Sequence, residues 1–316
     1  MNGLKVTDLF SGAGGASAGL ERAGYQIEAC ANHWPTAIAT HSRNHPGAEH
    51  FTANLSETDF RAFPSTDVLW ASPSCVWHAR AGGRKKPPAD VERLREDEGS
   101  IDRATAFAVI AATEVHGYEA IIVENVIEFT EWVLFDWWAD GMAALGYRLQ
   151  QQVIDAYDVG EAQRRKRWFG VFTRAGGVDL SAPDLPRRNA LDILDADPGK
   201  PMTRRMYVSP QVDTIDDGRR HLVTYRRNAK ARAAGDFPLA TITAGGRHHA
   251  VAQIIDGVPH HRMLSLRELA RGQGFPDSYE FEGKSDDVRK QIGNAVSVRV
   301  AEHLGRRVAA SLGLAA

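Results

Sequence analysis

The sequence has few of the features that cross-link a chain or anchor it in a membrane. It holds two cysteines among 316 residues, too few for the disulfide framework of a small secreted domain. No stretch approaches the ~20 apolar residues that a membrane-spanning helix needs, and the first residues lack the apolar run of a secretory signal. We therefore expect a reducing, cytoplasmic setting and no membrane partner.

The sequence also lacks the excess of positive charge that marks many nucleic-acid-binding proteins. Its formal net charge is -2, but residues 163–232 carry 16 Lys and Arg against 8 Asp and Glu. A basic segment on an acidic body is what a localised phosphate-binding face requires. A solvated, arginine-rich loop has the same composition, so charge alone leaves both interpretations open.

The first half of the chain alternates short apolar runs with segments of helical periodicity. Strands are expected at Leu4–Leu9, Tyr25–Ala31, Thr66–Ala71, Ala120–Val123 and Trp168–Phe172, with helices at Ala16–Ala23 and Ala104–His116. This alternation predicts an α/β fold with a parallel, doubly wound sheet. Beyond about residue 174 the apolar runs shorten, and regular patterning returns near residue 263. We expect a main body of residues 1–175 and 263–316, and a smaller, loop-rich domain of residues 176–262.

Residues with chemical potential follow three of these strands. The turn Phe10–Gly15 could bring backbone N–H groups to a ligand at the carboxyl edge of the sheet, although a tight structural turn looks the same. Cys75 and Glu124 follow two further strands, and neighbouring strands would place them in one crevice. A lone cysteine is more often inert packing, whereas a carboxylate directly after an apolar strand is costly to bury without a task.

A basic run, Gln163–Arg167, precedes the last expected strand. Its alternate residues could face one way and contact a base or a phosphate; a solvated turn is the other interpretation. No metal site is expected, because the histidine pairs at 248–249 and 260–261 have no cysteine or carboxylate at ligand spacing. Cys30, inside the second strand, is expected to be packing.

Six motifs, in order along nearly the whole chain, resemble those of the DNA cytosine-5 methyltransferase family. They are Asp8–Gly15, Pro73-Ser74-Cys75, Glu124-Asn125-Val126, the alternate residues of Gln163–Arg167, Arg267-Glu268 with Gln273–Asp277, and Gln291–Val296. The resemblance implies a Rossmann-like methyltransferase sheet with a smaller target-recognition domain at 176–262, S-adenosyl-L-methionine as cofactor and double-stranded DNA as partner. A monomer of bacterial or phage origin is expected, and a cognate restriction enzyme acting on the same site is left open.

The resemblance also implies roles for individual residues. Cys75 would add to C6 of a cytosine flipped out of the duplex, Glu124 would bind the N3/N4 edge, and Arg165 would contact O2. Further substrate contacts are expected from Asn125, Val126, Gln163, Arg167, Arg80, Arg84, Tyr225, Arg226 and Arg227. Cofactor contacts are expected from Phe10, Ser11, Gly12, Gly14, Gly15, Asn32, His33, Trp34, Asn54, Pro73, Asn294 and Val296.

The chain departs from the family pattern beside the nucleophile and at the cofactor. Ser74 and Val76 flank Cys75 where the family has Pro-Cys-Gln. His33 stands where the family has a ribose-binding glutamate, and Asn54 where an acidic residue contacts the adenine amine. Two alternatives stay open: cytosine-5 methylation of tRNA, and a non-catalytic DNA-binding relative, against which the retained catalytic residues argue.

Overall fold

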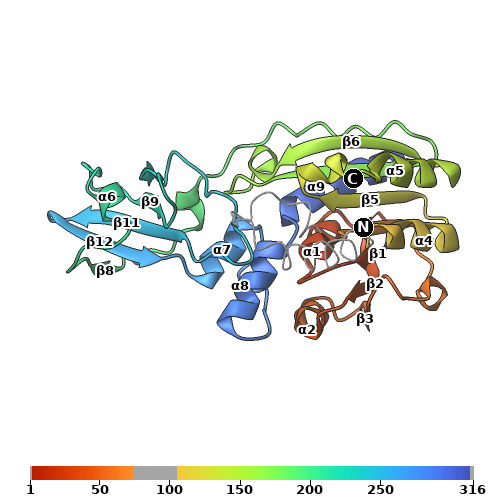
Figure 1. The fold of residues 1–316 in the computed structure, drawn as a ribbon, viewed down its shortest axis with the longest axis horizontal. Helices are drawn as coiled ribbons and strands as arrows, with labels where there is room; N and C mark the ends of the chain where they lie inside the picture. The colour runs from red at the N-terminus through yellow and green to blue at the C-terminus, as the bar shows by residue number, and fades with distance from the viewer. Residues whose placement is uncertain (1, 75–104, 314–316) are drawn as a thin grey trace, which may run out of the picture. The chain divides into compact units, whose positions relative to one another are not determined.

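The computed structural model describes residues 2–74 and 105–313, which form two compact units (Figure 1). The first unit contains Met1–Ile154, Lys166–Ala182 and Val300–Ala316, and the second contains Asp155–Arg165 and Pro183–Arg299. Each unit has its own sheet and its own apolar core. None of the helices in the described residues is long and apolar enough to span a membrane.

The first unit is built on a seven-stranded sheet with the order β3-β2-β1-β4-β5-β7-β6 (Figure 1). Its strands are β1 (Lys5–Leu9), β2 (Gln26–Asn32), β3 (Glu49–Thr52), β4 (Val68–Ala71), β5 (Ala120–Asn125), β6 (Arg148–Asp155) and β7 (Lys166–Thr173). Its helices are α1 (Gly15–Arg22), α2 (Pro35–Asn44), η1 (Phe60–Ala62), α4 (Phe107–His116), η3 (Ile127–Glu131), α5 (Phe135–Ala144) and α9 (Val298–Ser311).

The strand directions confirm the predicted α/β class, with one difference. Strands β3, β2, β1, β4 and β5 pair in parallel, as expected for a Rossmann-like sheet. Strand β7 lies between β5 and β6 and runs antiparallel to β5. Its first residues therefore lie at the edge of the sheet where the parallel strands end.

The central strands are held by burial on both faces. Every residue of β4 and of β5 is buried, which is typical of parallel strands covered by helices. Aromatic rings pack beside β7: Trp168 lies 5.3 Å from Phe129 and 5.6 Å from Phe135 between ring centroids. This cluster fixes the start of β7 against the end of β5.

The second unit contains a five-stranded sheet with the order β10-β9-β11-β12-β8. Its elements are η4 (Ala156–Val159), η5 (Ala190–Ile193), β8 (Lys200–Pro201), α6 (Ser209–Val212), β9 (His221–Thr224), β10 (Arg232–Ala233), β11 (His249–Ile255), β12 (Val258–Met263), α7 (Leu266–Gly272) and α8 (Ser285–Asn294). The hairpin β11–β12 turns at Asp256 (φ 50°) and Gly257 (φ 78°), the left-handed pair that a two-residue hairpin turn requires.

The expected domain boundaries differ in part from these units. The expected boundary at 175 lies close to the structural division between Ala182 and Pro183. Asp155–Arg165 and residues 263–299, both expected in the main body, are part of the second compact unit. The assignment of 176–262 to target recognition stays a prediction.

Candidate active site

The predicted residues of the first unit that the structure describes gather at one edge of its sheet. Because β1, β2, β4 and β5 run parallel, their carboxyl ends share that edge, and the antiparallel β7 begins there. The strand order changes direction between β1 and β4. Ligands of open α/β sheets bind outside the carboxyl ends of the strands at such a point.

The glycine-rich turn after β1 has an open, left-handed backbone. Phe10, Gly12 and Gly14 have φ values of 61°, 54° and 85°, and Gly14 donates its N–H to the Ser11 carbonyl at 2.9 Å. A side chain at Gly12 would meet nothing within 4 Å. Helix α1 then begins at Gly15 with no acidic residue in its first turn. The turn therefore leaves space and backbone donors for a ligand, as the motif predicts.

Asp8, in β1 just before this turn, has a fully buried carboxyl group. The Ser17 hydroxyl donates to Asp8 Oδ2 at 2.6 Å. Burial raises the pKa of Asp8 to about 7, against the opposing effect of the Ser17 hydrogen bond. A carboxyl group with this pKa changes charge near neutral pH, and Asp8 is the first residue of the cofactor motif.

The ends of β2 and β3 present polar side chains to solvent. His33 and Asn54 are exposed, while Asn32 is buried and its Oδ1 accepts the Trp34 N–H at 2.9 Å. Asn54 Oδ1 accepts the Ser56 N–H at 3.2 Å. With the open turn after β1, these groups fit an adenosine-type cofactor lying along the strand ends. Of the other predicted cofactor residues, Pro73 is buried at the end of β4, and Asn294 (exposed) and Val296 (buried) belong to the second unit.

Glu124, at the end of β5, is paired with an arginine. Its side chain is nearly buried, and its Oε1 lies 3.3 Å from Arg167 Nε. The register pairs Asn125 with Trp168, which brings the start of β7 beside Glu124. Among the alternate residues of the basic run, Arg167 is therefore the one whose side chain pairs with Glu124, the expected catalytic acid. Its position was unforeseen in the sequence, where Arg167 was expected only among the substrate contacts.

Asn125 ties the end of β5 to the end of β4. It is fully buried, and its Nδ2 donates to the Pro73 carbonyl at 3.3 Å. The Ser74 N–H donates to Thr105 Oγ1 at 3.1 Å, so the described residues on either side of 75–104 are hydrogen-bonded to each other. Three predicted residues, Cys75, Arg80 and Arg84, lie outside the described residues.

Gln163 is buried inside the second unit. Its Nε2 donates to the Gly272 carbonyl at 2.9 Å and to Gln273 Oε1, and its Oε1 accepts the Ile242 N–H at 3.2 Å. Gln273, also fully buried, donates to the Ile292 carbonyl at 2.7 Å. Two glutamine side chains thus join three of the six motifs. The expected contact of Gln163 with DNA stays a prediction.

Arg165 also bonds within the second unit. It is only 5% exposed, its Nη1 donates to the Ile242 carbonyl at 3.0 Å, and its N–H donates to Asp155 Oδ1 at 2.9 Å. These bonds hold residue 242 beside the basic run. The expected contact of Arg165 with a cytosine oxygen stays a prediction.

The predicted recognition residues lie after β9. Arg226 and Arg227 are exposed, and Tyr225 is half-buried. The Tyr225 ring stacks on Tyr207 with centroids 5.9 Å apart, and Arg226 Nη2 lies 3.0 Å from His248 Nε2. Exposed guanidinium groups beside stacked aromatic rings fit contacts with phosphates and bases.

Comparisons with known proteins cover nearly the whole chain. A family model described as C-5 cytosine-specific DNA methylase matches residues 4–310. Type II methyltransferase M.HgiDI of Herpetosiphon aurantiacus is 29% identical over 98% of this chain and 95% of its own. M.HhaI of Haemophilus parahaemolyticus is 22% identical over 99% and 96%. The crystal structure of S. pombe Dnmt2 methyltransferase has a TM-score of 0.66 at 18% identity, covering 98% of each chain. That of Entamoeba histolytica methyltransferase EhMeth scores 0.71 at 16% identity, over 98% of this chain and 99% of its own.

Proposed function

Because this chain belongs to the C-5 cytosine-specific DNA methylase family, we propose that it methylates C5 of a cytosine flipped out of double-stranded DNA, with Cys75 as nucleophile. Membership of the family confirms the predicted enzyme class, a DNA cytosine-5 methyltransferase. The observation that carries the mechanism is the Glu124–Arg167 pair at the end of β5, beside the strand end that leads to Cys75.

The chemistry requires an attacking thiolate. C5 of cytosine is a poor nucleophile, and addition of the Cys75 sulfur to C6 pushes an electron pair towards C5, which becomes enamine-like. C5 would then take the methyl group from the sulfonium of S-adenosyl-L-methionine, whose sulfur keeps the bonding electron pair as a neutral thioether. Loss of the C5 proton to a base restores the C5–C6 double bond and expels the Cys75 thiolate, so that atoms and charge balance. The target cytosine must leave the stacked duplex to reach Cys75.

Glu124 and Arg167 present complementary groups to the flipped base. A protonated carboxyl group can donate a hydrogen bond to N3 and accept one from the N4 amine, and so stabilise the negative charge that moves onto the ring as C6 is attacked. A guanidinium beside it can donate to the O2 atom on the same edge. We therefore add Arg167 to Arg165 as a candidate for the O2 contact. Asn125 supports this position by tying β5 to the Pro73 carbonyl, and its Oδ1 accepts the Val126 N–H at 2.8 Å; contacts of both residues with the substrate stay part of the proposal.

S-adenosyl-L-methionine, when bound, supplies an electrophilic methyl group. The open turn Phe10–Gly15 would receive the cofactor on its backbone N–H groups, and Asn32, His33, Trp34, Asn54 and Pro73 would line the neighbouring strand ends. The expected cofactor contacts of Asn294 and Val296 stay predictions. The replacements at His33 and Asn54 keep hydrogen-bonding groups but remove two negative charges that the family pattern has there.

Double-stranded DNA is the proposed substrate, met by Tyr225, Arg226 and Arg227 and by Arg80 and Arg84. Several relatives are named Type II methyltransferases, which supports a partner restriction enzyme acting on the same site. We propose that the protein works as a monomer in the cytoplasm of a bacterium or of a phage-infected cell, where its DNA substrate lies.

Transfer of tritium from labelled S-adenosyl-L-methionine tests this function. Wild-type protein should label duplex DNA and not tRNA, and Cys75→Ala should abolish the label. Glu124→Gln should slow the labelling. Its matched control is Glu114→Gln, an exposed change on α4, which should leave the rate unchanged. Label in tRNA alone would overturn the DNA substrate, and label in neither would support the non-catalytic relative.

Covalent trapping on DNA that contains 5-fluorocytosine tests the nucleophile separately. Fluorine at C5 cannot leave as a proton does, so the adduct with C6 should persist in wild-type protein and be absent in Cys75→Ala. Trapping that survives this substitution would assign the attack to another residue.

A further inference from the structure

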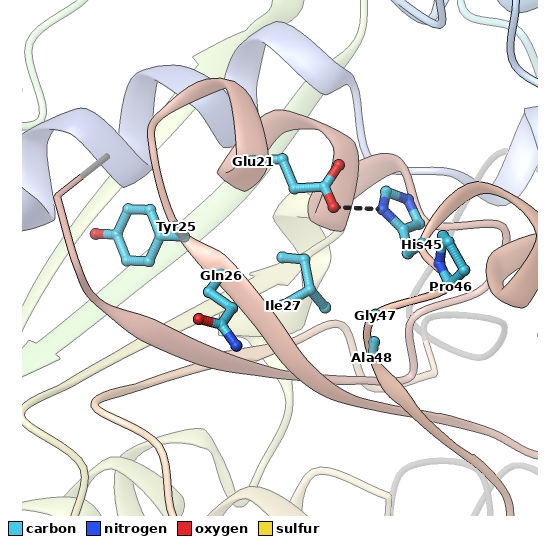
Figure 2. Close-up of a pocket in the computed structure, with 8 residues that line it drawn as sticks. All are labelled: Glu21, Tyr25, Gln26, Ile27, His45, Pro46, Gly47 and Ala48. Carbon is cyan, nitrogen blue, oxygen red and sulfur yellow. Dashed lines mark ion pairs between the residues drawn. The ribbon is translucent and has the colours of Figure 1, made fainter.

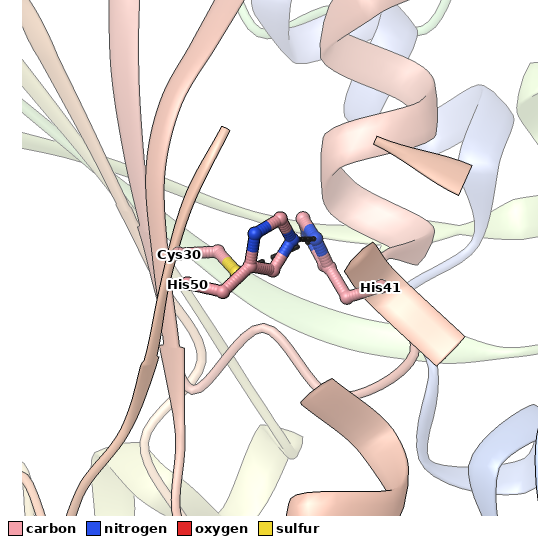
Figure 3. Close-up of side chains that lie close together, drawn as sticks. All are labelled: Cys30, His41 and His50. Atoms are coloured by element: carbon pink, nitrogen blue, oxygen red, sulfur yellow. Dashed lines mark hydrogen bonds between the residues drawn. The ribbon is translucent and has the colours of Figure 1, made fainter. Parts of the chain in front are cut away.

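Three potential metal ligands, none of which belongs to the six motifs, meet in the first unit (Figure 3). Cys30 comes from β2, His41 from α2 and His50 from β3. Cys30 Sγ lies 3.3 Å from His41 Nδ1, which lies 3.0 Å from His50 Nε2. All three atoms lie within 4.8 Å of one another. Cys30 and His41 are fully buried, and His50 is half-buried.

We propose that Cys30, His41 and His50 form a binding site for a divalent transition-metal ion of the zinc class. Tetrahedral zinc, with Zn–N of ~2.0–2.1 Å and Zn–S of ~2.3 Å, separates its ligand atoms by roughly 3.3–3.6 Å. The Cys30–His41 and His41–His50 separations fall within a few tenths of an ångström of that spacing, and the Cys30–His50 separation is no more than 4.8 Å. A thiolate with two imidazoles selects zinc-like ions over magnesium or calcium, which prefer oxygen.

A second shell of hydrogen bonds orients His41 for this role. His41 Nε2 lies 2.9 Å from Ser17 Oγ, and the Ser17 hydroxyl donates its proton to Asp8 at 2.6 Å. Ser17 therefore accepts from the Nε2–H of His41, which leaves the lone pair of that ring on Nδ1. Nδ1 is the atom that faces Cys30 and His50. Metal-bound histidines commonly have such a hydrogen-bonded partner on the other ring nitrogen.

The charges of the cluster balance when a divalent ion is present. Binding converts the Cys30 thiol to a thiolate and releases its proton to solvent. The thiolate and the fully buried Asp8 carboxylate together offset the two positive charges of the ion. Buried charges are stable only when they are paired in this way.

The site has a route to solvent. Strand β3 is the edge strand of the sheet, so the half-buried His50 is reached from that side. On the other side, the His45 ring lies 4.5 Å from the His41 ring and lines a surface hollow, where its Nδ1 pairs with Glu21 at 2.9 Å (Figure 2). The remaining lining residues of that hollow are Tyr25, Gln26, Ile27, Pro46, Gly47 and Ala48.

A metal here would fasten three elements that carry the cofactor residues. Strands β2 and β3 lead directly to the positions of His33 and Asn54, and α2 follows the first of these. An ion bound to all three elements would oppose their separation on unfolding, because a bound ion stabilises only the folded arrangement of its ligands. The role is therefore structural, in the half of the unit that receives adenosine.

Cobalt(II) is the probe for this site. Full-length, untagged protein is stripped with a chelator and titrated with Co²⁺, whose tetrahedral thiolate complexes absorb strongly through sulfur-to-metal charge transfer. We expect this band to saturate at one equivalent and to disappear on addition of Zn²⁺. Wild-type protein that shows no charge-transfer band at saturating Co²⁺ would overturn the proposal and leave a purely hydrogen-bonded cluster.

Two cysteine variants assign the band, since the chain has only two cysteines. Cys30→Ser should abolish it, and the matched control Cys75→Ser should retain it; the reverse result would place the ion at the nucleophile and refute the site. His50→Gln, at the accessible edge, should weaken Zn²⁺ binding at least tenfold in chelator competition. Ser17→Ala should weaken it by roughly 10–100-fold. Zn²⁺ should raise the Tm of wild type and of Cys75→Ser, but not of Cys30→Ser; equal shifts in all three would refute the site.

Discussion

Replacement of Gln163 by leucine should destabilise the second unit by about 2–4 kcal/mol. The fully buried side chain makes three hydrogen bonds, to the Gly272 carbonyl, to Gln273 Oε1 and from the Ile242 N–H. Leucine is of similar size but leaves these three polar groups without that partner, at about 1–3 kcal/mol for each group that stays unsatisfied. Burial of the leucine side chain offsets roughly 1–2 kcal/mol, and rotation of Gln273 can recover one of the bonds.

Urea denaturation with two probes measures this loss. The second unit has no tryptophan, because the seven of the chain are Trp34, Trp70, Trp77, Trp132, Trp137, Trp138 and Trp168. Tryptophan fluorescence therefore reports the first unit, while far-UV circular dichroism reports both. We expect Gln163→Leu to lower the urea midpoint in circular dichroism more than in fluorescence.

Gln253→Leu is the matched control, since Gln253 makes one exposed hydrogen bond, to the Gly218 carbonyl at 2.9 Å. Its free energy of unfolding should change by no more than about 0.5 kcal/mol. Gln163→Glu keeps the acceptor for Ile242 but loses the amide donor, and should fall between wild type and Gln163→Leu. A loss below about 1 kcal/mol for Gln163→Leu, or equal losses for the two leucine variants, would refute the reasoning.

Three further predictions follow from individual contacts. Glu124→Gln should slow methyl transfer by about 10²–10⁴-fold. Arg167→Met should slow it by at least about tenfold, and Arg167→Lys should lie between Arg167→Met and wild type. Single-turnover rates equal to wild type would show that the Glu124–Arg167 pair takes no part in the chemical step. Gly293→Ala would bring a Cβ within 2.3 Å of a neighbouring backbone nitrogen, so its Tm should drop by the equivalent of about 1–3 kcal/mol, whereas Gly218→Ala, with its nearest neighbour at 3.8 Å, should cost far less. Burial lowers the pKa of His249 from 6.5 to about 3. The folded state therefore resists protonation that the unfolded chain accepts, so stability is full above pH 6.5 and falls as the pH drops from 6.5 towards 3; His249→Gln should flatten that slope in urea midpoints measured across this range.

The local sequence by itself determined those elements whose residues are compatible with only one kind of surroundings, such as a buried strand or a left-handed turn. The apolar runs Val68–Ala71 and Ala120–Val123, which form β4 and most of β5, are buried at every position, because they contain no polar residue that could face water. The left-handed turn at Gly12 and Gly14 was readable because glycine enters that region without strain. In the second unit, Asp256-Gly257 is itself a hairpin signal, so part of the regular structure in the segment expected to be loop-rich could have been read from the sequence.

The order of motifs along the chain was sufficient to identify the family, and with it the roles expected of Cys75 and Glu124. Those roles depend on residue type and on position after a strand, and both are properties of the sequence. The direction in which each side chain of the basic run points is not a property of the local sequence. Gln163 and Arg165 precede β7, which begins at Lys166, so the simple alternation of a single strand did not apply to all three residues.

Tertiary packing decided the contacts between residues that are distant in sequence. The pairing of Arg167 with Glu124 depends on β7 running antiparallel to β5, and strand direction is set by the packing of the whole sheet. The meeting of Cys30, His41 and His50 likewise depends on α2 crossing between two neighbouring strands. Their spacing has no helical or strand period, so no local pattern announces the cluster, and only the folded sheet brings the three ligand atoms together.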